Sequence, residues 1–359
     1  MQGAAFEAAP PLLAEILQAC GVHGVLRGEA ENLWTETERR LSYCPVSISA
    51  AMIDYMLTYW SADPGRICDL SLVLHHDSRP CGLWSLSMYQ GPDGFRLGSS
   101  GGSMEPPLFV KGLAEKSLNQ LNARCLEVAL RLADAYEIAS WQTVESFSGS
   151  TGLSVWHERA MRAGASLRTQ HDLYVDLSPE FADIKRTIRK SYKSLISTGE
   201  REWQVAVLDG PGEDVWDTYR LLHLEVAGRA TRSLESWQVQ YQAIQAGTAF
   251  LVYLRDQGGR MVGGGLFHFT HDEGVYAVGA YDRNLFAKPL GHVVQFRAIE
   301  ELKRRGVRWY KIGARPYPSD NPVPTAKELA IADFKQGFSS HLFPRYFLDF
   351  NQKAALSGG

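Results

Sequence analysis

Apolar residues divide the chain into a helical opening and two later stretches in which short strands precede one long helix. In the opening, Leu12–Ala19 and Ile48–Tyr59 have helical spacing, and no segment is rich in β-branched residues. We therefore expect residues 1–65 to form a helical N-terminal segment without strands.

The first later stretch alternates apolar residues with Gly, Pro and Asp, as short antiparallel strands do. The expected strands are Ile67–His75, Pro80–Tyr89 and Phe95–Ser99. Leucines at helical spacing then predict a helix over Lys111–Ala135, and Ser140–Val144 has the character of one more strand.

The second half repeats this order of elements. Its expected strands are Ala249–Arg255, Arg260–Thr270 and Gly274–Ala280, followed by a helix over Pro289–Arg305 and a strand over Val307–Ile312. Only the order of the elements supports this repeat, because the amino acids of the two copies do not match. A repeat of this length predicts two similar structural units.

We therefore expect an α/β (α+β) fold of two tandem domains, residues 66–178 and 179–350. Each domain should have its own mixed, mostly antiparallel sheet flanked by helices, and the domains should meet near residues 178–205. Residues 351–359 should form a flexible tail.

A basic helix is expected at the start of the second domain, over residues 179–198. Lys185, Arg189 and Lys193 follow each other at intervals of four and would form one stripe on it. Such a stripe either is a solvated face or binds phosphate oxygens. Its place between the two domains favours phosphate binding, because ligands often bind between domains.

Composition narrows the class of protein. With 359 residues, of which 45% are hydrophobic, the chain can bury globular cores, and its net charge of −3 gives no general attraction to DNA or RNA. The five cysteines are too widely spaced for a disulfide framework or a zinc ribbon. Neither a long apolar span nor a secretory signal is evident, so we expect a cytoplasmic protein.

Several common catalytic motifs are missing from the sequence. HExxH, GxSxG, the phosphate-binding GxxxxGK[ST] and a strand-borne GxGxxG do not occur. These absences argue against metalloproteases, serine hydrolases, P-loop enzymes and dinucleotide-binding enzymes, and we expect no metal site.

Other segments offer candidate chemistry. The segment Gly279–His292 joins a strand to a helix N-terminus, where backbone N–H groups favour an anion. The triplet Gly263–Gly265 predicts a bulge or a close approach of backbone, which can expose an amide to a carbonyl oxygen. Arg315 begins a Pro-rich loop, and loops at sheet ends often carry function.

The segment Ala332–Phe338 places Lys335 between apolar residues that should be anchored in a core. Held in this way, the ammonium could stabilise developing negative charge. The alternative is an ordinary surface lysine on a turn.

From IKRTIRKSYKSLI through GRATRS, GGGLF and YAVGAYDRNLFAKPLGH to FKQGF, the second half resembles the FemABX-like branch of the GNAT acyltransferase superfamily. The resemblance covers roughly residues 180–345 and is weaker in the first half. It implies two GNAT domains in tandem, which agrees with the repeat of elements.

The resemblance implies transfer of an acyl or aminoacyl group to an amine of a cell-envelope sugar or peptidoglycan precursor linked to a nucleotide or lipid diphosphate. By resemblance, Lys335 assists at the reacting carbonyl, and Arg229 or Arg232 contacts the diphosphate. Tyr281 corresponds to the aromatic residue that the family has at the end of the third strand. Glu145 would hold the acceptor amine. Such acceptors are also compatible with peripheral association with a membrane.

Direct transfer needs alignment of the two reactants, a hydrogen-bond donor to the oxyanion and a group that accepts the amine proton. It needs no covalent nucleophile. By local position, Asp282 or Glu225 could accept the amine proton. Arg189, Lys193 and Arg315 are further candidates for contacts to an anionic substrate.

Two donors stay open, and we favour acyl-CoA over an aminoacyl-tRNA because the overall charge of the chain is negative. Acyl-CoA would be a co-substrate, and we expect no tightly bound cofactor. Only Gly291, followed by His292, remains of the Gly-rich loop that a CoA-binding GNAT protein would have. The alternative donor is an aminoacyl-tRNA. A third alternative is a binding protein without turnover, which recognises a glycan precursor or a partner protein.

Overall fold

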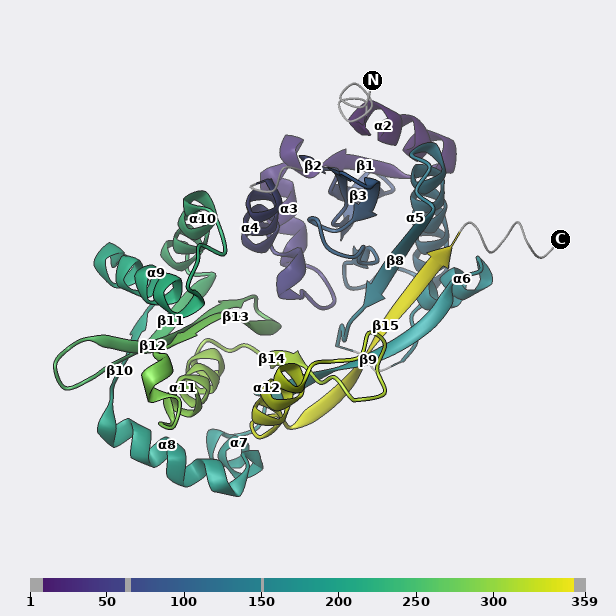
Figure 1. Cartoon of the computed structure of the whole chain (residues 1–359). Coiled ribbons are helices and arrows are strands. Elements are labelled where there is room, and N and C mark those ends of the chain that lie inside the picture. The colour runs from purple at the N-terminus through teal and green to yellow at the C-terminus, as the bar shows by residue number, and fades with distance from the viewer. Residues whose placement is uncertain (1–8, 62–65, 150–151, 352–359) are drawn as a thin grey trace. The chain divides into compact units, whose positions relative to one another are not determined.

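The computed structural model describes residues 9–61, 66–149 and 152–351, which form two compact units (Figure 1). The first unit contains the residues up to Thr169 and those from Pro344 onward, and the second contains Gln170–Phe343. Apart from Asn351, the expected flexible tail lies outside the described residues.

The expected α/β class with mostly antiparallel sheets is confirmed, but the boundaries differ from those expected. The chain leaves the first unit inside strand β9 (Ser166–Asp176) and returns to it inside strand β15 (His341–Asn351), not near residues 178–205. Each of these two strands contributes residues to both units, so the expectation of entirely separate sheets needs correction.

The first unit has the expected order of elements, in which strands are followed by one long helix and a further strand. Its helices are α2 (Ala9–Cys20), α3 (Glu31–Glu38), α4 (Ala50–Ser61), α5 (Glu115–Ala135) and α6 (Val155–Arg162). Its strands are β1 (His23–Leu26), β2 (Arg66–Asp69), β3 (Leu72–His76), β4 (Arg79–Trp84), β5 (Ser87–Gly91), β6 (Gly94–Gly98), β7 (Leu108–Phe109), β8 (Ser140–Glu145), the first part of β9 and the second part of β15. The strand orders are β1-β3-β4-β7 and β2-β5-β6, and β8 pairs with β15.

Two expected strands are each broken into two. Ile67–His75 becomes β2 and β3, and Pro80–Tyr89 becomes β4 and β5, so that the halves join different sheets. The two breaks face each other: the Leu70 amide donates to the Leu86 carbonyl at 3.0 Å, and the Leu86 amide donates to Ser71 Oγ at 3.2 Å. The breaks therefore depend on a contact between distant residues, which apolar spacing does not reveal.

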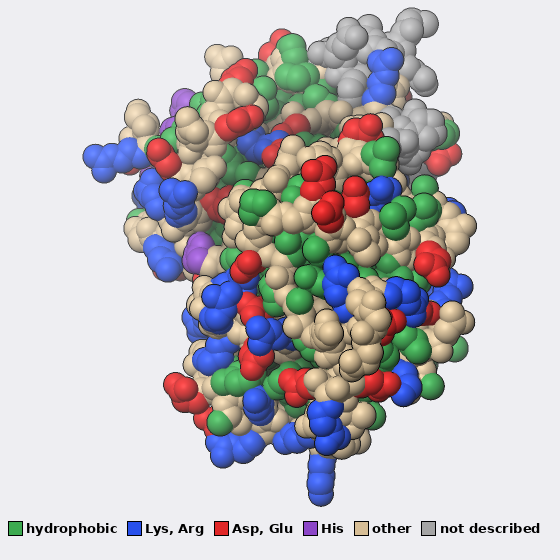
Figure 2. Space-filling model, turned by 90° about the vertical axis from the view of Figure 1, so that its left-hand side faces the viewer, with side chains coloured by type: hydrophobic (Ala, Val, Ile, Leu, Met, Phe, Trp, Pro, Cys, Tyr) green, Lys and Arg blue, Asp and Glu red, His purple; other side chains and the backbone are tan. Residues whose placement is uncertain are grey.

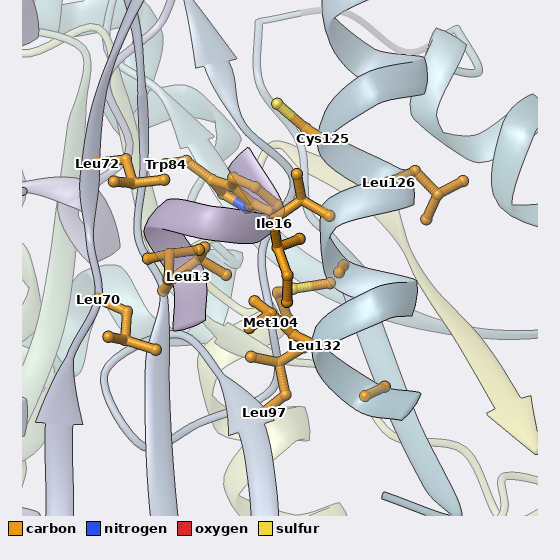
Figure 3. Packing of buried hydrophobic residues seen from close by; sticks show 14 of the residues in the cluster. Leu13, Ile16, Leu70, Leu72, Trp84, Leu97, Met104, Cys125, Leu126 and Leu132 are labelled. Atoms are coloured by element: carbon orange, nitrogen blue, oxygen red, sulfur yellow. The ribbon is translucent and has the colours of Figure 1, made fainter. Parts of the chain in front are cut away.

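The N-terminal segment is part of the first unit and not a separate preamble. The expectation that it contains no strand is wrong, because β1 pairs with β3 in antiparallel register. Helix α2 packs along α5, and Leu13 and Ile16 of α2 point into the same core as Trp84, Cys125 and Leu132 (Figure 3).

The second unit is a twisted sheet with helices on both faces. Its helices are α7 (Phe181–Thr187), α8 (Lys190–Glu202), α9 (Glu213–Ala227), α10 (Leu234–Gln245), α11 (Leu290–Arg304) and α12 (Ala326–Gln336). Its strands are the second part of β9, β10 (Gln204–Leu208), β11 (Ala249–Arg255), β12 (Met261–Phe269), β13 (Glu273–Tyr281), β14 (Trp309–Ala314) and the first part of β15. The order is β10-β11-β12-β13-β14-β9-β15, and from β10 to β9 each pair is antiparallel except β13 with β14.

The Gly263–Gly265 triplet confirms the expected close approach. A Cβ at Gly264 would lie 3.1 Å from the ring of Tyr219 on α9, and a Cβ at Gly265 would lie 3.0 Å from Val294 on α11. Helices α9 and α11 therefore cover opposite faces of β12 (Figure 1). One bulge lies directly beside the triplet, where Val262 is the extra residue opposite the step from Leu254 to Arg255. A second bulge lies in β13, opposite the step from Leu266 to Phe267.

The prediction of a single basic helix over residues 179–198 is wrong. The segment forms α7 and α8, with extended backbone at Ile188 and Arg189 between them. Ile188 is buried, and the Arg189 amide donates to the Gly337 carbonyl at 2.8 Å. This bond to a distant segment replaces a helical one, so Lys185, Arg189 and Lys193 do not share one straight helix face.

Within the described part of the chain, no helix combines the length and the apolar character needed to cross a membrane.

Packing of α2 into the first core predicts that Leu13→Ala destabilises the protein. Leu13 is 1% exposed, and truncation of a buried leucine usually lowers the free energy of unfolding by about 2–5 kcal/mol. Gln18→Ala, at an exposed position of the same helix, is the control and should change it by less than about 0.5 kcal/mol. Urea denaturation measures both variants, and equal midpoints would show that α2 does not belong to this core.

Candidate active site

Strands β13 and β14 pair over only part of their length. Their parallel ladder joins Glu273–Val275 to Trp309–Lys311, and in the described structure it covers three residue pairs. Beyond Val275, β13 continues to Tyr281 in register with β12 alone. The edges of β13 and β14 that face each other there are free to hydrogen-bond a ligand with amide groups.

A β-bulge lies in β13 just beyond the end of this ladder. Leu266 is opposite Val278 and Phe267 is opposite Tyr276, so Ala277 is the extra residue. Ala277 is exposed. A bulge takes the backbone of its extra residue out of the regular ladder, which allows it to bond another group.

Lys335, in the last turn of α12, lies between the two diverging strands. Its ammonium is 5.5 Å from the centre of the Tyr276 ring on β13, and its side chain lies on Gly313 of β14. A Cβ at Gly313 would overlap the Lys335 Nζ, and Gly313 also has a φ of +146°, which favours glycine. Lys335 is half-buried, so the surface lysine considered as an alternative is excluded.

Two opposing influences act on the Lys335 ammonium. Burial lowers the pKa of Lys335 below its ordinary value of 10.5, and the carboxylate of Asp172 on β9 opposes this. Asp172 is 1% exposed and its Oδ2 is 3.0 Å from the Nζ of Lys311 on β14. Asp172 and Lys311 therefore form an ion pair between the neighbouring strands β9 and β14.

Tyr276 and Tyr281 form one wall of this site. Their hydroxyl oxygens are 3.3 Å apart, and a Cβ at Gly279 would overlap the Tyr276 hydroxyl. Tyr281 also packs on Gly263, where a Cβ would lie 2.8 Å from its ring. Burial raises the pKa of both hydroxyls, so both are neutral at pH 7 and can donate hydrogen bonds.

The helix end that carries Lys335 is held from two sides. Arg315 places its Nη2 at 2.9 Å from Asp333 Oδ1 and donates from Nε to Gln336 Oε1 at 2.8 Å. Arg189 donates to the Asp333 carbonyl at 3.2 Å, and the Tyr192 hydroxyl donates to the Phe334 carbonyl at 3.2 Å.

Arg189 and Arg315 were expected to bind an anionic substrate, but the structure gives both guanidinium groups partners in α12. They therefore hold the end of α12 that carries Lys335. Their contact with an anionic substrate stays a prediction. Lys193, on α8, is exposed and keeps its charge at the surface.

Gly291 and His292 were expected to contact a cofactor, and the structure uses both for packing. A Cβ at Gly291 would lie 3.2 Å from the Phe334 ring, and His292 packs edge-on to Tyr192 with ring centres 4.5 Å apart. Burial lowers the pKa of His292 to about 4, so it is neutral at pH 7.

Three amides at the start of α11 are also engaged. Those of His292 and Val293 donate to the Pro289 carbonyl, and the Leu290 amide donates to the Lys288 carbonyl. This helix start therefore offers less to a pyrophosphate than its sequence suggested.

The two expected proton acceptors lie on elements other than that of the lysine. Asp282 is 5% exposed, its Oδ2 is 2.8 Å from Arg260 Nη1, and its Oδ1 accepts the Asn284 amide at 2.9 Å. The Arg260 hydrogen bond and that amide lower the pKa of Asp282, which makes it a weak base. Glu225 lies on α9, exposed to solvent.

Arg232 belongs to a second polar cluster, between α9 and α10. Its guanidinium lies 4.9 Å from the Trp237 ring centre, and its Nη1 donates to Gln240 Oε1 at 3.4 Å. Three buried atoms of this cluster, Arg232 Nε, Gln240 Nε2 and Thr231 Oγ1, have no hydrogen-bond partner among the described residues. The cluster can therefore bind a ligand with several acceptor oxygens, whereas Arg229 is exposed to solvent.

Glu145 ends strand β8 in the first unit. Ser154 Oγ donates to its Oε1, and its Oε2 is 3.3 Å from Nδ1 of the buried His157. Glu145 is thus held by two neighbours close in sequence.

The sequence interpretation missed Tyr276, Ala277 and Gly313 around Lys335. It also missed the ion pair of Asp172 with Lys311 on the neighbouring strands. Tyr276 and Tyr281 are separated by small or apolar residues, and KIG ends a strand, but neither pattern is specific. Only the pairing of β9, β13 and β14 brings these residues together.

No protein-family model matches this chain, and neither does any curated protein. Solved structures do. A crystal structure of FemX is 12% identical, with a TM-score of 0.66 over 93% of this chain and 98% of FemX.

Two further structures have the same arrangement. The C-terminal domain of a putative lysylphosphatidylglycerol synthetase from Agrobacterium fabrum is 12% identical, with a TM-score of 0.58 over 92% of this chain and 95% of that domain. L-PGS from Bacillus licheniformis is 13% identical, with a TM-score of 0.56 over 90% of this chain and 91% of that chain. At these identities the likeness concerns the fold, and the chain therefore has the FemABX-like fold that FemX and the two other structures share.

Proposed function

We propose that this protein transfers an acyl or aminoacyl group from an activated donor to an amine, without a covalent enzyme intermediate. One observation carries the proposal: a half-buried lysine ammonium lies where β13 and β14 diverge, beside a bulged strand. A positive charge fixed in a partly desolvated place is suited to a developing oxyanion.

The chemistry requires little else from the protein. The amine lone pair attacks the donor carbonyl carbon, the C=O electron pair moves to oxygen, and the oxyanion is stabilised by Lys335. The electron pair on the oxygen then re-forms the C=O bond, and the bond to the leaving group breaks. The amine proton passes to the leaving group or to water. Alignment of the two reactants supplies much of the acceleration, equivalent to effective molarities of about 10⁵ M or more.

The proposed acceptor is an amine of a cell-envelope sugar or peptidoglycan precursor. One structure with the same fold is the C-terminal domain of a putative lysylphosphatidylglycerol synthetase, whose name states an aminoacyl group on a lipid and so supports an envelope acceptor, but not the choice of an amine. The Arg232 cluster, with its unpartnered buried donors, is the place we propose for the diphosphate of such an acceptor.

The first donor we propose is an acyl-CoA thioester. The facing edges of β13 and β14 beyond Val275 and Lys311 can hydrogen-bond an extended chain that carries amide groups, as CoA does.

The second donor is an aminoacyl-tRNA, which a different observation favours. Exposed basic residues gather on α7 and α8, at the lower end of the face in Figure 2. They are Lys185, Arg186, Lys190, Lys193 and Arg201. A surface of this kind binds nucleic acid with affinity that falls steeply as salt rises.

Parallel assays distinguish the donors. The purified protein is incubated with an amino-sugar acceptor and either acyl-CoA or aminoacyl-tRNA, and the products are weighed by mass spectrometry. A product with acyl-CoA supports the thioester, and a product with aminoacyl-tRNA that is lost at high salt supports tRNA. Thermal stabilisation by the acceptor without product from either donor would contradict transferase activity and favour a binding protein.

Lys335→Met should lower kcat by about 10²- to 10³-fold and leave the acceptor KM nearly unchanged. Methionine keeps most of the aliphatic stem on Gly313 but removes the charge that is needed chiefly in the transition state. Steady-state kinetics measure the effect, with Lys327→Met as control, an exposed lysine of the same helix. A raised KM with unchanged kcat would assign Lys335 to ground-state binding instead.

The same lysine predicts how the rate depends on pH. Only the protonated form stabilises an oxyanion, so kcat should fall as pH rises through the pKa of Lys335. Because burial lowers that pKa, the fall should begin below the range of an ordinary lysine. A rate that stays level to pH 10.5 would contradict the role of the ammonium.

Arg232→Ala should raise the acceptor KM by about tenfold or more and leave kcat unchanged. A guanidinium that binds the diphosphate acts equally in the ground state and the transition state, so its loss weakens binding uniformly. Kinetics with a diphosphate-linked acceptor measure the effect, and Arg229→Ala is the comparison. If Arg229→Ala raises KM and Arg232→Ala does not, the diphosphate lies at the exposed loop arginine.

A further inference from the structure

Strand β10 forms one edge of the sheet of the second unit (Figure 1). It runs from Gln204 to Leu208 and pairs with β11 in antiparallel register, with Gln204 opposite Arg255 and Leu208 opposite Leu251. In an edge strand, every second residue turns its amide and carbonyl away from the sheet. These outward groups are the ones that another chain can bond.

The register of the neighbouring strands identifies the outward residues of β10. The Phe269 amide donates to the Thr248 carbonyl at 2.9 Å, in line with the ladder of β11 and β12. Residues of β11 with even numbers therefore bond β12, and those with odd numbers bond β10. The odd-numbered residues lie opposite Gln204, Ala206 and Leu208. The amides and carbonyls of Val205 and Val207 consequently point away from the sheet.

The outward groups of Val205 and Val207 have no hydrogen-bond partner in the described parts of the chain. Both side chains are half-buried and pack on the core of the second unit. From Gln204 to Leu208 the strand contains no charged residue, proline or glycine. It therefore lacks the side chains with which proteins usually keep an edge strand from pairing.

The other described edge strands differ from β10 in this respect. Strand β7 has only two residues, β1 and β6 contain glycine, and β2 begins with Arg66 and ends with Asp69. The outer edge of β8 is already bonded, because the Met104 amide donates to the Gln142 carbonyl at 3.3 Å and the Val144 amide donates to the Met104 carbonyl at 2.7 Å. Among the described edges, β10 is the one without such protection.

The strand is complementary to a second copy of itself. In an antiparallel pair centred on Ala206, Val205 of each copy lies opposite Val207 of the other, so every outward amide of these valines meets an outward carbonyl. The same register brings the exposed parts of the valine side chains together, and such pairs stabilise a sheet.

The charges at the two ends of β10 agree with this register. Arg201 precedes the strand, is exposed and has no carboxylate partner among the described residues. Asp209 follows the strand and binds Arg305 through Oδ2, which leaves its Oδ1 available. An antiparallel pair places the end with Arg201 of each copy beside the end with Asp209 of the other.

We propose that this chain forms a two-fold symmetric dimer through β10, in which the sheets of the two second units join edge to edge. The inference goes beyond the proposed transfer reaction and does not depend on it. Two strands of five residues bury less than the roughly 1,200 Å² of an ordinary stable interface, so the dimer is weak and forms reversibly as concentration rises.

Sedimentation equilibrium of the full-length protein, from micromolar to submillimolar concentration, tests the dimer. Val207→Pro should raise its dissociation constant by about tenfold or more, because the symmetric pair loses this amide donor twice. Proline is tolerated there within one chain, because the Val207 amide does not bond β11. Val207→Thr, which keeps the amide and the branched shape, is the matched control and should still dimerise.

Cross-linking tests the register. Ala206 lies opposite its own copy at a position without ladder hydrogen bonds, where Cα atoms are about 4.5 Å apart, within reach of a disulfide. Mild oxidation of Ala206→Cys should therefore give a covalent dimer. Gln238→Cys, at an exposed position of α10, should give little of it, and so should the unmodified protein.

Hydrogen exchange provides a reading that needs no substitution. The amides of Val205 and Val207 should exchange more slowly as protein concentration rises, whereas those of Ala206 and Leu208, which bond β11, should not change. Slow exchange of both valines at every concentration would show that the edge is covered within one copy, and would overturn the inference.

A protein that stays monomeric at every concentration would also overturn it. So would a dimer that Val207→Pro leaves intact and that gives no disulfide in Ala206→Cys, because such a dimer forms elsewhere. If Val207→Pro does not fold, the cross-linking of Ala206→Cys decides. None of these readings requires turnover, so a failure of the transfer reaction leaves them unchanged.

Discussion

The absence of one side chain sets the geometry of the second unit. Because Gly313 has no Cβ, a lysine from α12 can lie against β14 at the place where β14 leaves β13. The cost is a desolvated ammonium, which the buried Asp172 carboxylate partly offsets. Arg189, Arg315 and Tyr192 then hold the end of α12, so the charge stays where the strands diverge.

Local patterns predicted the elements that depend on local forces. The helix over residues 289–305 is confirmed as α11, because its apolar spacing, its basic last turn and the left-handed Gly306 that follows all agree. Lys335 was found because its apolar neighbours in sequence imply an anchored segment. The wrong predictions lie where distant residues intervene: the Gly337 carbonyl ends α7 early, and the Leu86 segment breaks the strand at Leu70.

In the candidate site, too, the sequence predicted what depends on residue type and missed what depends on distant partners. Arginines at positions 189 and 315 have the right chemistry for phosphate, and nothing nearby in sequence shows that Asp333 and Gln336 already bind them. Residue type therefore indicated charge but not partner. Arg232 differs because its Nε remains without a partner in the described fold, so its chemistry is still available.

The two compact units share strands in a way that matters while the chain is being made. Strand β8 pairs with the last part of β15, Tyr346–Asn351, and the whole second unit lies between these partners in sequence. During synthesis from the N-terminus, every residue of the second unit therefore leaves the ribosome before β8 can gain that partner. The unit that begins the chain is the last to be completed, and until then one edge of β8 is left for a chaperone or for a strand of another molecule.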